Sequence, residues 1–164
     1  MTNPVPAVNR ANPIPEGYTA LTPFLVVDGG ARAVEFYCEA FGATVVERMD
    51  APDGRILHAE LDFGAGRMQV SDPHPEMGLR APDGTTEVDH SYVLYCADVD
   101  AVFSRAIALG ARVFEEPSTF VTGDRFASML DPFGHRWAVM TRVEDVPAEE
   151  AKRRLDEWAA QQNA

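Results

Sequence analysis

The chain has 164 residues, a formal net charge of −12 and a hydrophobic content of 46%. This length suits one domain or two small fused modules, because domains commonly contain about 100–150 residues. Nucleic acids and anionic membrane surfaces require a basic face, and no cluster of Lys and Arg supplies one here. No apolar run approaches the ~20 residues of a membrane-spanning helix, and we expect no signal peptide.

The two cysteines, Cys38 and Cys96, stand outside any CxxC or Cys/His ligand spacing. Cys38 falls in a helical pattern and Cys96 in a strand pattern. We therefore expect two free thiols in the reducing environment of the cytoplasm.

Residues 1–17 carry four prolines among small and polar residues, so we expect a flexible or extended arm there. The next elements form a strand–helix–strand–strand–strand series, in which the helix shows one apolar stripe and ends at Gly42. The predicted elements are a strand at 21–27, a helix at 31–41, and strands at 44–49, 56–63 and 67–71.

The same series then occurs a second time. Asp98 is a plausible N-cap for the second helix, and Gly110 ends it as Gly42 ends the first. An internal repeat of this kind constrains the fold strongly, and it predicts an α+β protein with two tandem βαβββ modules. The elements predicted for the second copy are a strand at 90–97, a helix at 99–109, and strands at 112–115, 126–130 and 136–141.

The domain plan follows from the repeat. We expect the modules at 18–72 and 89–143, joined by a polar linker at 73–88. Residues 144–164 form a C-terminal extension, in which Pro147 opens a terminal helix.

Several short runs within residues 21–143 carry a resemblance to a known family. On these runs and the repeat, the chain resembles the vicinal oxygen chelate superfamily, which includes glyoxalases, extradiol dioxygenases, fosfomycin-resistance enzymes and bleomycin-resistance proteins. Within it, the chain is most similar to the PhnB-like branch, although that branch often has Trp where this chain has Thr122. The runs are Thr22–Leu25, Glu35–Tyr37, Phe41–Ala43, Gly54–Leu61, Asp98–Asp100, Gly123–Arg125 and Asp131–Trp137.

The resemblance implies a fold of curved, half-open sheets with the helices outside. The hollow, or cup, would hold a small organic molecule. Members generally form dimers, sometimes by exchanging modules, so the resemblance implies a homodimer. Many PhnB-like sequences carry a methyltransferase label, but no Gly-rich cofactor loop follows a strand here, and that activity is not carried over.

Metal-dependent members hold one divalent ion as a Lewis acid, using His, Glu or Gln side chains. The matching positions here are Thr22, Gln69, Ser91 and Ala138. Alanine has no ligand atom, and Thr or Ser hydroxyls are poor lone ligands for Zn²⁺, Mn²⁺ or Fe²⁺. The resemblance therefore implies loss of the metal site and no cofactor. His90 is next to Ser91, but strand alternation places it on the side under the helix.

The strand at 56–63 alternates, with His58 and Glu60 on the face opposite its apolar residues. This pair could perform general acid/base chemistry, form a non-standard metal site, or simply shape the cup or the dimer seam as a hydrogen-bonded pair.

Three further side chains complete the predicted ligand site with Gln69. Phe24 and Tyr95 are expected to face the cup and stack on a planar ligand. Arg125 either pairs locally with Asp124 or reaches into the cup to bind an anionic or carbonyl group. Trp137 is expected in the core.

Three hypotheses about function follow. In the first, the chain is a metal-free binder of a small organic molecule, in the style of the bleomycin-resistance proteins, and its acidity would permit a cationic ligand. In the second, it is a lyase, isomerase or dioxygenase that uses displaced metal ligands or the His58/Glu60 pair. In the third, the interior is filled and the chain serves as a structural dimer.

Overall fold

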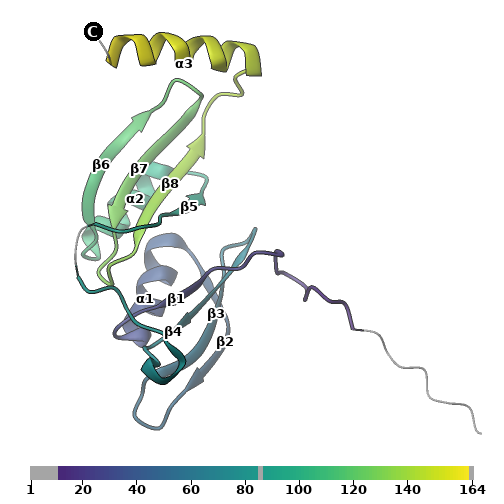
Figure 1. Cartoon of the computed structure of the whole chain (residues 1–164), viewed down its shortest axis with the longest axis vertical. Helices are drawn as coiled ribbons and strands as arrows, with labels where there is room; N and C mark the ends of the chain where they lie inside the picture. Colours follow the sequence, from purple (N-terminus) through teal and green to yellow (C-terminus); the bar gives the residue numbers. More distant parts are fainter. Residues whose placement is uncertain (1–10, 85–86, 163–164) are drawn as a thin grey trace, which may run out of the picture.

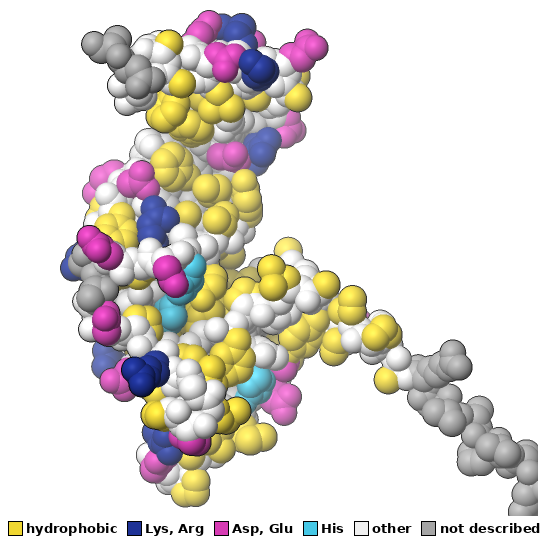
Figure 2. All heavy atoms as spheres, viewed as in Figure 1, with side chains coloured by type: hydrophobic (Ala, Val, Ile, Leu, Met, Phe, Trp, Pro, Cys, Tyr) yellow, Lys and Arg dark blue, Asp and Glu magenta, His cyan; other side chains and the backbone are white. Residues whose placement is uncertain are grey.

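The computed structural model describes residues 11–84 and 87–162; the rest of the predicted arm, residues 1–10, lies outside the described residues. Two modules follow one another along the long axis of the molecule (Figure 1), which Figure 2 shows in the same view with all heavy atoms as spheres. Each contains one helix and one four-stranded sheet, with strand orders β1-β4-β3-β2 and β5-β8-β7-β6. The α+β repeat predicted from the sequence is therefore confirmed.

The elements of the first module are followed by a linker with one 3₁₀ turn, the second module and a terminal helix. They are β1 (Phe24–Val26), α1 (Gly30–Phe41), β2 (Thr44–Asp50), β3 (Ile56–Asp62), β4 (Arg67–Ser71), η1 (Pro75–Met77), β5 (Tyr92–Tyr95), α2 (Val99–Ala108), β6 (Arg112–Thr119), β7 (Asp124–Leu130), β8 (Arg136–Arg142) and α3 (Ala148–Gln162).

The helix boundaries have the expected local causes. Gly42 adopts a left-handed conformation, with φ 74°, and its N–H bonds to the Cys38 carbonyl oxygen at the end of α1. The Asp98 side chain accepts from the Ala101 N–H at 3.0 Å and caps α2. α1 and α2 pack against each other and so join the two modules.

Strand register shows which positions of the two modules are equivalent. The parallel pair β1–β4 places Phe24 opposite Gln69, and the parallel pair β5–β8 places Val93 opposite Ala138. Each sheet has one face covered by the helices and one that they leave uncovered. We call the uncovered faces the first and the second open face.

Several predicted strands have different ends in the structure, and β7 begins at Asp124 rather than at 126. β1 is shorter than the predicted strand at 21–27, because Pro23 has no N–H and contributes only its carbonyl oxygen, which accepts from the Gln69 N–H at 2.9 Å. β5 is also shorter than the strand predicted at 90–97. β6 continues to Thr119 through Pro117, which a sheet edge tolerates.

The turn before β8 is built on the buried carboxylate of Asp131. One carboxylate oxygen accepts from the Tyr37 hydroxyl at 2.8 Å and from the Trp137 ring N–H at 2.9 Å. The other accepts from the backbone N–H groups of Phe133 and His135, each at 2.9 Å. Trp137 is only 3% exposed, which confirms its predicted place in the core.

The structure also bears on the membrane expectation. No helix in the described part of the chain combines the length and the apolar character needed to cross a bilayer.

Candidate functional site

The first open face brings together four of the predicted site residues. Phe24 pairs with Gln69, and Gln69 pairs with Glu60, so the three form a row across β1, β4 and β3. His58 lies two residues before Glu60 on the same face, and its ring centroid is 6.2 Å from that of Phe24. An exposed aromatic ring therefore borders a polar cluster.

Glu60 is the centre of that cluster. Its carboxylate lies 3.5 Å from His58 Nε2 and 3.7 Å from Arg67 Nη1. The pKa of Glu60 is lowered, first by the nearby Tyr18 hydroxyl and then by His58 and Arg67. Glu60 is therefore an ionised carboxylate at neutral pH, ringed by three possible donors.

The N-terminal segment before β1, which we call the arm from here on and which includes Tyr18 and Thr19, covers part of this face. The Tyr18 ring lies over the Arg67 guanidinium, with its centroid 4.9 Å from Cζ. Gly17 has φ 81°, and a Cβ there would come within 2.6 Å of Arg67 Nη2. The sequence interpretation missed both Tyr18 and Arg67. The register of β4 could have identified Arg67, which shares the face of Gln69, whereas nothing in the Pro-rich arm marks Tyr18.

The second open face carries the predicted residue Tyr95, whose side chain is 56% exposed. Arg136 occupies the position on β8 that Arg67 occupies on β4, two residues before Ala138 and Gln69 respectively. Arg136 donates to Ser91 Oγ at 2.9 Å, and to Ser128 Oγ and Glu115 Oε2 at 3.2 and 3.3 Å. Tyr95 and Phe24 therefore lie on different sheets of the chain.

Arg125 lies away from both open faces. It makes a two-pronged ion pair with Asp100 on α2, with N···O distances of 2.6 and 2.7 Å. Asp124 instead pairs with Arg142 at 2.9 Å. The local Asp124–Arg125 pair, one of the two alternatives for Arg125, does not form. Arg125 shares the strand face of the buried Ala127, which the helices cover, and not the face of Phe126.

The side chains at the four positions that match the family's metal ligands do not fit a divalent ion. Thr22 Oγ1 donates to a backbone carbonyl within the arm, and Ser91 Oγ is hydrogen-bonded to Arg136. Ala138 offers no ligand atom, so Gln69 alone has suitable chemistry. Across residues 11–84 and 87–162, no three His, Cys, Asp or Glu side chains group closely enough to hold an ion.

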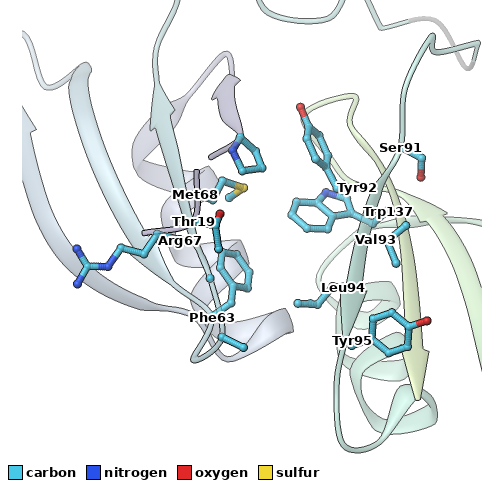
Figure 3. A pocket seen from close by; sticks show the side chains of 13 residues that line it. Thr19, Phe63, Arg67, Met68, Ser91, Tyr92, Val93, Leu94, Tyr95 and Trp137 are labelled. Carbon is cyan, nitrogen blue, oxygen red and sulfur yellow. The ribbon is translucent and has the colours of Figure 1, made fainter. Parts of the chain in front are cut away.

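A groove of about 490 Å³ runs along the seam between the two sheets. Its walls are largely aromatic and aliphatic: Phe63 and Met68 face Tyr92 and Trp137 across it, while the Arg67 side chain points away (Figure 3). The groove lies at the seam and not within the curve of either sheet, so it does not test the hypothesis of a filled cup. Sequence patterns did not reveal it, because it depends on how the modules pack together.

His135 lies where the second module meets β1. Its Nε2 is 3.1 Å from the Val26 carbonyl oxygen, and its Nδ1 is buried with no hydrogen-bond partner among the described residues. Burial lowers the pKa of His135, and the nearby Asp131 carboxylate opposes that shift only in part. The folded protein therefore holds this imidazole neutral.

We expect the melting temperature to fall as the pH drops below about 6.5, the usual pKa of an unfolded-state histidine. The unfolded chain takes up this proton more readily than the folded chain, so the stabilisation is complete above that pH and declines below it. Thermal unfolding between pH 8 and 5 measures the slope. His135→Gln should reduce the slope; equal slopes in the wild type and His135→Gln would refute the explanation.

The sequence of the chain matches a known protein family. The family model of the Glyoxalase/Bleomycin resistance protein/Dioxygenase superfamily matches residues 18–139. An uncharacterized protein of Mycobacterium bovis is 36% identical over 134 residues, covering 80% of this chain and 88% of its own length. A Mycobacterium tuberculosis relative has the same identity and covers 79% of its own length.

Solved structures show the same fold. TioX from Micromonospora sp. ML1 has a TM-score of 0.59 and 24% identity, covering 76% of this chain and 98% of its own. The PhnB protein from Bacillus cereus has a TM-score of 0.59 and 19% identity, covering 75% and 99%. The fosfomycin resistance protein FosX from Listeria monocytogenes has a TM-score of 0.59 and 14% identity, covering 81% and 97%. The chain belongs to the glyoxalase/bleomycin resistance protein/dioxygenase superfamily.

Proposed function

We propose that the protein binds a small organic molecule on the first open face without the metal ligand set of the superfamily. The observation that supports this most directly is the polar cluster of His58, Glu60 and Arg67 beside the Phe24 ring, which is 40% exposed. An aromatic wall next to a few polar groups is the usual composition of a small-molecule site. Gln69, in the same row, adds an amide that can donate or accept.

A metal-free enzyme is the second candidate function. The His58 ring nitrogen lies 3.5 Å from an ionised Glu60, and a carboxylate at that place would orient the imidazole. A bound substrate could then exchange a proton with His58. This second function would use the same first open face. A binding experiment therefore tests both candidates before any reaction is assayed.

Native mass spectrometry of protein purified from its own cells, without added chelator, tests the proposal. We expect a bound organic mass in the wild type, and roughly tenfold weaker retention in His58→Ala, the loss of about one hydrogen bond to a charged partner. His74→Ala is the matched control, because His74 lies 3.3 Å from Glu76 in the same i, i+2 arrangement outside the sheet. Equal retention in both variants would refute the site, and a stoichiometric divalent ion would refute metal-free binding.

We also propose a homodimer, in which the first open face of one protomer meets the second open face of the other. Exposed apolar side chains on both faces support it, namely Phe24 on the first and Val93 and Tyr95 on the second. Such pairing would bring Phe24 and Tyr95, which one chain keeps on separate sheets, to one ligand. Light scattering should give twice the 18.0 kDa chain mass; a constant single-chain mass at micromolar concentrations would contradict the dimer.

Within the superfamily, we propose that the chain belongs to the PhnB-like branch and acts in the cytoplasm. The runs around Tyr37, His58 and Trp137, and the fold shared with the Bacillus cereus PhnB protein, support the branch. The free thiols of Cys38 and Cys96 suit a reducing compartment.

A further inference from the structure

The two modules place an arginine at the same position, but the two side chains are used differently. Arg136 on the second open face gives hydrogen bonds to Ser91, Ser128 and Glu115. The Arg67 side chain on the first open face makes no hydrogen bond to a described residue, since its nearest carboxylate oxygens, on Glu60 and Asp62, are 3.7 and 3.9 Å away. Arg67 therefore keeps donor capacity that its counterpart has spent.

Two donor groups of this cluster are shielded from solvent and lack an acceptor. Arg67 Nε and the Tyr18 hydroxyl oxygen are both buried with no hydrogen-bond partner among the described residues. Tyr18 lies close enough to Glu60 to lower its pKa, but not in regular hydrogen-bond geometry. A buried donor without an acceptor is unfavourable, so a ligand oxygen that reached either group would satisfy an unmet hydrogen bond.

The charges around the donors define which acceptor fits. Glu60 is ionised, and Asp62 is the second carboxylate near the guanidinium, so a ligand carboxylate would meet two like charges. An ammonium group would satisfy neither donor, because it has no lone pair to accept with. A neutral carbonyl oxygen has two lone pairs, so it can accept hydrogen bonds from both the Tyr18 hydroxyl and the Arg67 guanidinium, and it adds no charge.

We propose that Tyr18 and Arg67 form a subsite for the carbonyl oxygen of a neutral, planar ligand, such as an aryl ketone, whose ring packs towards Phe24. The inference rests on the proposed binding function and names the ligand class that the first open face selects. The N-terminal arm thereby contributes a binding group, because Gly17 lets the chain pass close enough to Arg67 for Tyr18 to stack on it.

Three probes of similar size test the subsite by calorimetry and ligand-detected NMR: neutral acetophenone, anionic benzoate and cationic benzylamine. We expect acetophenone to bind the wild-type protein best. Tyr18→Phe and Arg67→Lys should each weaken it by about tenfold, the loss of one hydrogen bond. Arg136→Lys is the matched control at the equivalent position and should leave acetophenone binding unchanged. Circular dichroism and melting temperature verify that each variant folds.

A second readout separates a direct contact from a structural role. Acetophenone labelled with ¹³C at the carbonyl should show a downfield carbonyl shift on binding, because two donors polarise the C=O bond. Tyr18→Phe should reduce that shift even at saturating ligand. Tighter binding of benzylamine or benzoate, with dependence on His58 but not on Tyr18 or Arg67, would overturn the carbonyl subsite and leave the proposed function standing. No measurable binding of any of the three probes would contradict both.

Discussion

Replacing Asp131 with alanine is expected to lower the free energy of unfolding by about 4 kcal/mol. The carboxylate accepts four hydrogen bonds, two from side chains and two from the backbone. Burial and the Asp131 charge raise the pKa of Tyr37, so the tyrosine hydroxyl stays protonated and remains a donor. Alanine would leave the donors of Tyr37 and Trp137 buried without an acceptor.

Urea unfolding followed by circular dichroism measures the Asp131→Ala effect. The experiment uses one fixed protein concentration, because the apparent stability of a dimer depends on it. Asp145→Ala is the control, since that side chain is 98% exposed, and it should change stability by less than about 0.5 kcal/mol. A loss below about 1 kcal/mol in Asp131→Ala would show that the turn is held by other contacts.

Asp72→Ala is expected to cost about 3 kcal/mol, because one buried carboxylate connects three backbone donors. It accepts from the N–H groups of Gly29 and Gly30, each at 3.0 Å, at the start of α1. It also accepts from the Ile56 N–H at 2.7 Å at the start of β3. Removing it would leave the helix terminus uncapped and detach it from the sheet.

The repeat offers an internal control for this prediction. Thr141 occupies the place of Asp72 in the second module, and its hydroxyl accepts from the Val99 N–H at 2.9 Å at the start of α2. Thr141→Val removes one uncharged hydroxyl, which also donates to the Cys96 carbonyl oxygen at 3.0 Å, and should cost about 1 kcal/mol. Urea unfolding of the two variants should therefore differ by about 2 kcal/mol. Equal losses would mean that the charge and the extra donors of the Asp72 site contribute nothing.

Most of the fold could be predicted because its signals are local and occur twice. Gly42 and Asp98 mark helix boundaries through backbone geometry and hydrogen bonding, which depend on neighbouring residues alone. Strand ends were less predictable. β1 begins only at Phe24 because Pro23 has no N–H to donate, and β6 tolerates Pro117 because it lies at a sheet edge.

The site could be predicted only where strand alternation determined it. His58, Glu60, Gln69 and Phe24 share a face because of their positions along three paired strands. The prediction for Arg125 did not hold because its partner Asp100 is on a helix, and strand alternation does not identify partners on other elements. Tyr18 joins the site through an irregular arm, for which no periodic pattern exists.

The most direct test of the central claim is to map amide chemical shifts on ¹⁵N-labelled protein titrated with the tightest-binding of the three probes. We predict that the largest shifts cluster on the first open face, at Phe24, His58, Glu60, Arg67 and Gln69, and extend to Tyr18 in the arm. A cluster along the seam groove at Tyr92, Leu94 and Trp137, with the first open face unperturbed, would contradict the proposed site.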